Sequence, residues 1–197
     1  MFRAGPPPEY GNRRKARRDG VQPGLGHRRR STRSAGGDAV TGLPEIPDAF
    51  DASRDLLATR DLAAPLPRLW AAWTDPAQLP LWWGPKGFHC ETKEIDLRHG
   101  GQWRFTMVGP DGTRYENRVR YLAMIPQAQI DYVIDDDGAG MVCFGARARF
   151  SATGTGSRVE MHSRFDSPAT LLDMERFRAR EGLASTLACL ATFLDGA

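Results

Sequence analysis

Residues 142–150 read VCFGARARF, with an apolar side chain at every second position and Arg147 and Arg149 between the last three of them. One side of an extended chain would carry the apolar members, which are Val142, Phe144, Ala146, Ala148 and Phe150. The arginines would lie on the other side. This period-two pattern predicts a β-strand with one buried and one solvent-exposed face. Sheets built from such strands are antiparallel, and other elements cover their apolar side.

Neighbouring segments repeat the alternation. Trp103, Phe105 and Met107 would share one face, and so would Val159, Met161 and Phe165. Glycine, proline and aspartate clusters separate these segments and predict about six strands from Phe88 onward. Upstream we expect a first strand over residues 56–63, a short helix over 65–73 and a second short helix from Pro76, capped by Asp75, that ends before Gly84-Pro85.

The end of the chain predicts the cover for the sheet. Leu183, Leu187, Leu190 and Leu194 recur at steps of four, three and four, which places them on one stripe of a long helix. A separate short helix over residues 171–177 would precede it, with Gly182 as the joint. The predicted fold class is therefore α+β: a curved antiparallel sheet wrapped on a long C-terminal helix, with two short helices after the first strand.

Charge divides the chain into two parts. Residues 1–48 carry 10 Lys and Arg against 5 Asp and Glu, whereas the rest carries 17 against 19. The first part contains three consecutive prolines, two arginine-rich runs and few large apolar residues, so we predict a disordered Arg/Pro/Gly-rich tail over 1–48 and one domain over 53–197. Weak, non-specific contact of this tail with nucleic acid is the only nucleic-acid binding expected.

The remaining composition indicates a soluble cytoplasmic protein. No run approaches the roughly 18 apolar residues of a membrane span, so no membrane partner is expected. Cys90, Cys143 and Cys189 are odd in number and widely spaced, which favours buried thiols in a reducing compartment. The sequence leaves homodimer formation open.

Short motifs then appear in a characteristic order. They are Ala64-Pro65 with Trp70 and Ala72, Thr74-Asp75-Pro76, Trp82-Trp83-Gly84-Pro85 with Gly87-Phe88, Asp96-Leu97-Arg98 with Gly100-Gly101, and Gly109-Pro110-Asp111-Gly112 with Tyr115. This ordered set resembles the activator of heat-shock-protein-90 ATPase homologue (AHSA-type) family, within the START-like (SRPBCC, birch-pollen-allergen-like) superfamily. The resemblance covers residues 57–194. It implies a helix-grip fold whose long helix closes an elongated cavity that holds a small hydrophobic molecule.

Ten residues are candidates for contact with that molecule: Trp82, Trp83, Phe105, Tyr115, Asn117, Tyr121, Phe144, Met161, Leu183 and Leu187. Trp82 and Trp83 would either line the mouth of the cavity or anchor the short helices to the sheet. Tyr115, Asn117 and Tyr121 share a strand face, where their polar atoms would orient a ligand or hydrogen-bond within the protein.

Catalytic and metal chemistry have weaker support in the sequence. His162 would share the outer face of the sheet with Arg158 and Arg164, so it would point away from a cavity. No histidine forms a convincing metal-ligand pattern with another His, Asp or Glu, and no nucleotide-binding motif occurs, so no cofactor or metal is expected. The acidic run 135–137 favours a solvated loop over a calcium site.

Three functions are compatible with these observations. The first is binding of a small hydrophobic ligand without defined catalysis. The second is a polyketide cyclase-like enzyme in which Tyr115 or Asp96 assists proton transfer, and the third is regulation of a heat-shock-protein-90-type chaperone ATPase through a protein interface. A carboxylate directed inward beside a tyrosine would favour the enzyme, and an exposed apolar patch would favour the chaperone partner.

Overall fold

The computed structural model describes residues 49–137 and 142–196, without the side chains of residues 142 and 143. The predicted disordered tail over 1–48 lies outside the described residues. The described elements are, in chain order, β1 (Asp55–Leu62), α1 (Leu66–Thr74), α2 (Leu79–Trp82), β2 (His89–Ile95), β3 (Gln102–Val108), β4 (Arg114–Ile125), β5 (Gln129–Asp135), β6 (Val142–Thr153), β7 (Gly156–Arg164), α3 (Pro168–Arg176) and α4 (Ala179–Asp195). The helices among them are too short or too polar to cross a membrane.

The strands form one antiparallel sheet in the order β1-β7-β6-β5-β4-β3-β2. Each strand from β2 to β6 pairs with the next one along the chain, and β1 joins the free edge of β7. A glycine is required where β7 begins, because a Cβ at Gly156 would lie 2.1 Å from the carbonyl oxygen of Leu62. The close approach of these two chains fixes the β1–β7 edge of the sheet.

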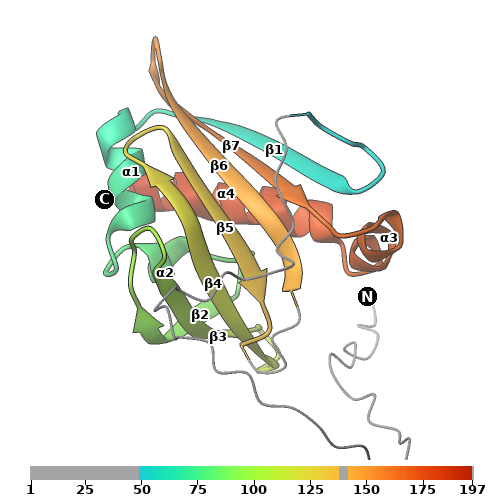
Figure 1. Cartoon of the computed structure of the whole chain (residues 1–197). Helices are drawn as coiled ribbons and strands as arrows, with labels where there is room; N and C mark the ends of the chain where they lie inside the picture. The colour runs from blue at the N-terminus through green and yellow to red at the C-terminus, as the bar shows by residue number, and fades with distance from the viewer. Residues whose placement is uncertain (1–48, 138–141, 197) are drawn as a thin grey trace, which may run out of the picture. The chain divides into compact units, whose positions relative to one another are not determined.

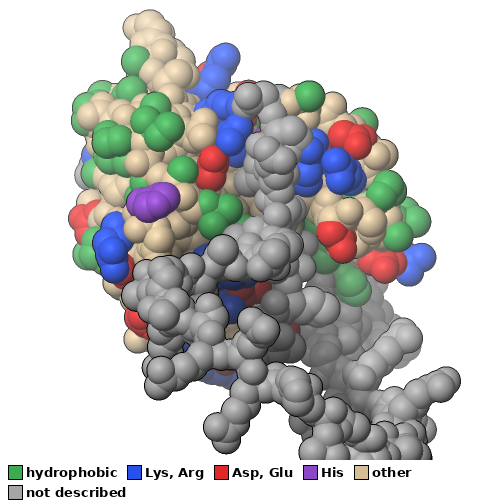
Figure 2. Space-filling model, in the orientation of Figure 1, with side chains coloured by type: hydrophobic (Ala, Val, Ile, Leu, Met, Phe, Trp, Pro, Cys, Tyr) green, Lys and Arg blue, Asp and Glu red, His purple; other side chains and the backbone are tan. Residues whose placement is uncertain are grey.

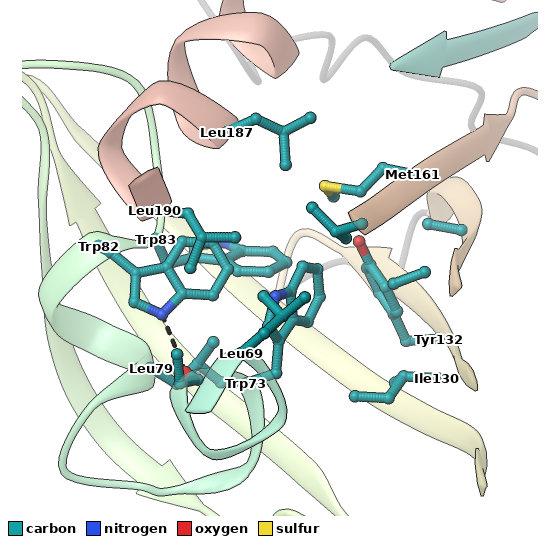
Figure 3. Packing of buried hydrophobic residues seen from close by; sticks show 14 of the residues in the cluster. Leu69, Trp73, Leu79, Trp82, Trp83, Ile130, Tyr132, Met161, Leu187 and Leu190 are labelled. Carbon is teal, nitrogen blue, oxygen red and sulfur yellow. Dashed lines mark hydrogen bonds between the residues drawn. The ribbon is translucent and has the colours of Figure 1, made fainter. Parts of the chain in front are cut away.

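Helix α4 covers the apolar inner face, as Figure 1 shows behind the curved strands. Leu187, Leu190 and Leu194 are buried against the sheet, and Leu183 is half-buried. With side chains from α1, α2 and the strands they form one large apolar cluster, part of which Figure 3 shows. The predicted fold class, an α+β helix-grip arrangement, is confirmed.

Two helix boundaries differ from the prediction. Helix α2 begins at Leu79 rather than Pro76, because the Asp75 carboxylate accepts hydrogen bonds from Ala77 N and Gln78 Nε2 and holds the intervening residues in a turn. The joint between α3 and α4 lies at Arg178, which has φ of 59°, and Gly182 is inside α4. Ser167 begins α3 by accepting a hydrogen bond from Thr170 N.

The outer face of the sheet carries ion pairs between neighbouring strands. Arg118 lies 2.9 Å from Asp135, Arg104 lies 2.7 Å from Asp137, and Arg147 lies 2.7 Å from Asp131. Figure 2 shows basic and acidic side chains next to one another on this face. The prediction of a solvated loop over 135–137 is wrong for Asp135, which ends β5, and for Asp137. Their side chains are 0% and 2% exposed, because Arg118 of β4 covers the first and Arg104 of β3 covers the second.

Candidate ligand-binding site

Burial along the inner face of the sheet decreases towards one end. On β4, Val119 and Tyr121 are 1% and 5% exposed, whereas Tyr115 and Asn117 are only half-buried. On β3 the same change separates the buried Trp103 and Phe105 from Met107, and on β6 it separates the buried Ala146 from Phe144. We define the rim as Met107, Tyr115, Asn117, Phe144 and Leu183, the half-buried side chains at this end.

A short loop and the first turns of α4 complete the rim. Lys86 N donates a hydrogen bond of 2.9 Å to Ser185 Oγ, which ties the loop after α2 to α4. The rings of Phe88 and Tyr115 lie 6.4 Å apart, so the same loop also reaches β4. Gly84 allows the loop to turn with φ of 113°. The Trp-Trp-Gly-Pro motif therefore connects the buried interior to the rim.

Trp82 and Trp83 are both buried, as expected of anchors for the short helices. Trp82 Nε1 donates a hydrogen bond of 2.9 Å to the carbonyl oxygen of Ala72, which joins α2 to α1. The Trp83 ring lies 5.7 Å from Trp73 and 6.0 Å from Tyr132, so it also forms part of the interior surface. Of the two interpretations made from the sequence, anchoring describes both residues, and contact with a ligand stays a prediction.

The remaining buried candidates come from opposite walls of the interior. Phe105 on β3 stacks on Trp103 with ring centres 3.9 Å apart. Met161 projects from β7 on the same side of the interior as Leu187 of α4 (Figure 3). Six of the ten candidates are therefore buried in one apolar cluster, namely Trp82, Trp83, Phe105, Tyr121, Met161 and Leu187. The other four, Tyr115, Asn117, Phe144 and Leu183, belong to the rim.

Polar groups inside the cluster are few. Tyr121 and Tyr132 lie opposite each other on β4 and β5. Burial raises the pKa of both phenols, and for Tyr121 the nearby Tyr132 raises it further. Among the described residues the Tyr132 hydroxyl and Trp73 Nε1 have no hydrogen-bond partner. These two residues were not among the candidates, although the alternation of Ile130 and Tyr132 with the polar Gln129 and Asp131 could have identified Tyr132.

Asn117 makes a local contact. Its Nδ2 donates a hydrogen bond of 2.9 Å to the carbonyl oxygen of Tyr115, two residues earlier on β4. This bond uses one of the two amide hydrogens. The second amide hydrogen and the side-chain oxygen of Asn117 are therefore the groups with which this residue could orient a molecule at the rim.

Asp96 and His162 lie outside the interior, and Tyr115, the other residue considered for acid–base chemistry, lies at the rim. Asp96 is partly exposed in a turn, where Arg98 Nε donates to its carboxylate at 2.8 Å. His162 lies on the outer face as predicted, but it is 3% exposed, because its Nε2 is 2.7 Å from Asp55 Oδ2 and its ring lies 5.9 Å from Phe50. No group of three His, Cys, Asp or Glu in the described part of the chain is placed to hold a metal ion.

Comparison with known proteins places the fold among bacterial relatives. A model of the family described as Activator of Hsp90 ATPase homolog 1-like protein matches residues 63–195. A crystal structure of a Nitrosomonas europaea protein is similar at 25% identity and TM-score 0.66, covering 75% of this chain and 97% of its own. A Mycobacterium smegmatis protein is also similar at 25% identity and TM-score 0.66, covering 73% and 92%.

A third structure carries the family name itself. The AHSA1 protein from Silicibacter pomeroyi is 28% identical with a TM-score of 0.56, covering 72% of this chain and 97% of its own. No curated protein sequence matches the chain.

Proposed function

Because the chain belongs to the Activator of Hsp90 ATPase homolog 1-like family and forms a START-like domain, we propose that it binds a small apolar molecule between α4 and the inner face of the sheet. The rim is the entrance. Its Tyr115, Asn117, Phe144 and Leu183 meet the molecule first, and the six buried candidates of the apolar cluster enclose it.

The observation that carries this proposal is the decrease in burial towards the rim. Phe144 and Leu183 pack against this large cluster and against a smaller one formed by Leu56, Phe165 and Leu171. Both residues are nevertheless only half-buried and keep part of their apolar surface accessible. Covering such surface is favourable by roughly 25 cal/mol per Å², so an apolar molecule seated there gains free energy. Binding sites for small molecules are typically lined by apolar side chains with a few polar groups at fixed positions, and the side chains behind the rim are of this kind.

A titration with the neutral fluorophore N-phenyl-1-naphthylamine tests the proposal. We expect saturable binding to the full chain, and we expect Leu183→Gln to weaken it about tenfold because apolar contact at the rim is lost. Leu172→Gln is the matched control, since Leu172 is 61% exposed on α3 and is not a rim residue, and its replacement should leave the affinity unchanged. Failure of the wild-type protein to bind, or an equal effect of both variants, would contradict the proposal.

A further inference from the structure

Two hydrogen-bond donors in the interior lack partners among the described residues. Tyr132 is 1% exposed and Trp73 is 2% exposed, yet neither the Tyr132 hydroxyl nor Trp73 Nε1 meets an acceptor. Two other buried tryptophans do: Trp82 Nε1 donates to Ala72 O, and Trp103 Nε1 donates to Thr92 Oγ1. More than nine in ten buried polar groups are satisfied in folded proteins, so these exceptions need a cause.

Both donors belong to one region of the interior. The Trp83 ring lies within 6.0 Å of both the Tyr132 and Trp73 rings, so the three side chains are contiguous. On β6 the residue paired with Tyr132 is Ala146, which has a small side chain. In Figure 3 the hydroxyl points toward the side of the interior where Met161 and Leu187 lie, and both of these are apolar.

The chemistry of the two donors defines what they can bind. An indole N–H can only donate, and a tyrosine hydroxyl donates readily, so both groups require an acceptor atom. The buried charged residues among those described, Asp55, Asp135, His162 and Arg164, alternate with the inner-face residues of β1, β5 and β7 and lie on the outer face. A charged ligand would therefore be buried without a counter-ion, which is strongly unfavourable.

We propose that the ligand is an uncharged apolar molecule with a carbonyl-type acceptor oxygen, and that the Tyr132 hydroxyl donates a hydrogen bond to this oxygen. The inference rests on the proposed function, because it names the class of molecule that enters through the rim. Tyr132 orients the ligand by its one polar atom, and the apolar cluster encloses the rest.

A matched pair of probes tests this assignment: 2-acetylnaphthalene, which carries a carbonyl oxygen, and 2-ethylnaphthalene, which has nearly the same shape without it. Binding of each to the full ¹⁵N-labelled chain is measured by chemical-shift titration in wild type and Tyr132→Phe. We expect Tyr132→Phe to weaken 2-acetylnaphthalene about three- to tenfold, the worth of one hydrogen bond, and to leave 2-ethylnaphthalene unchanged.

The possible outcomes separate the two claims. If neither probe binds wild-type protein, the proposed function fails and the inference with it. If both bind but Tyr132→Phe leaves 2-acetylnaphthalene unchanged, or weakens both equally, ligand binding stands and the assignment to Tyr132 is overturned. Urea unfolding of the ligand-free variant adds a further check: its midpoint should not fall below wild type, and a lower midpoint would mean that the hydroxyl already has a partner, such as a fixed water.

Discussion

Tyr121 on β4 and Tyr132 on β5 are directly opposite residues, and both side chains belong to the apolar cluster between the sheet and α4. Burial disfavours the ionised form of both phenols, so the pKa of each lies above its usual value of 10.0. The interior therefore contains buried hydroxyl groups, and their burial disfavours a charge there. The alkaline stability of the domain should therefore report on these two residues.

The first prediction is a loss of stability at high pH that depends on the buried tyrosines. A phenol whose pKa is raised on folding contributes stability below its unfolded pKa of about 10, and this contribution is lost as the pH rises above that value. At pH 11 the loss of unfolding free energy is about 1.4 kcal/mol for each phenol that stays protonated in the folded protein. Urea unfolding at pH 8 and pH 11 should show a smaller decrease for Tyr132→Phe than for wild type, and a smaller one still for the double Tyr121→Phe/Tyr132→Phe variant. Equal decreases in all three proteins would contradict burial of the phenols.

A second prediction concerns acid and the buried cluster on the outer face. Burial of Asp55 opposes its ionisation, but hydrogen bonds from Arg164, Asp51 N and His162 outweigh that effect and lower its pKa from 3.8 to about 2. Because the folded pKa is lowered, the contribution to stability is present above pH 4 and is lost as the pH falls from 4 to 2; it amounts to at most about 2 kcal/mol.

Asp55→Asn tests this cluster directly. The substitution leaves Arg164 buried, at 5% exposed, without its carboxylate, so we expect a loss of about 2 to 4 kcal/mol at pH 7 and a shallower acid transition. Asp61→Asn is the control, because Asp61 pairs with Arg158 at an exposed position and its replacement should change stability little. Urea unfolding between pH 2 and 7 gives the comparison, and identical profiles for wild type and Asp55→Asn would refute the role of the cluster.

The third prediction tests the packing of α4. Leu187 is 2% exposed at the centre of the leucine stripe, so Leu187→Asp would bury a carboxylate without a partner at a cost of several kcal/mol. That is comparable with the roughly 5 to 15 kcal/mol stability of a whole domain, and we expect the variant not to fold. Leu172→Asp, at an exposed position of α3, should fold normally. Native near-ultraviolet circular dichroism from Leu187→Asp would contradict the placement of the helix.

The fourth prediction concerns the boundary of the domain, which we propose lies between residue 45 and β1. Deletion of residues 1–45 removes the arginine-rich segment and keeps Ala49, whose carbonyl oxygen accepts a 3.0 Å hydrogen bond from Arg164. We expect the melting temperatures of the two forms to differ by no more than a few degrees, since segments without core contacts contribute little. A loss of cooperative unfolding would instead make the removed segment part of the domain.

Local patterns predicted the elements of this fold better than its contacts. The alternation at 142–150 and the leucine stripe at 183–194 correspond to β6 and α4, because strand and helix periodicity are properties of neighbouring residues. Burial of Asp135 depends on a register that places it opposite Arg118 on β4, which no local pattern specifies. The lack of a hydrogen-bond partner for the Tyr132 hydroxyl likewise depends on the side chains that α4 and β7 place around it. It could therefore be recognised only in the tertiary structure.

The central claim is that the space between α4 and the sheet accepts a small molecule, and Met161→Ala tests it most directly. Met161 is 4% exposed on the wall formed by β7. In a fully packed core this change typically costs about 2 to 5 kcal/mol, whereas a residue that lines an existing cavity has fewer contacts to lose. The measurement is urea unfolding of wild type and Met161→Ala beside titration of both with N-phenyl-1-naphthylamine. We expect Met161→Ala to lose about 1 to 2 kcal/mol of unfolding free energy and to change the dye affinity. A loss above about 4 kcal/mol, with no dye binding to either protein, would mean that the interior is fully packed and would contradict ligand binding there.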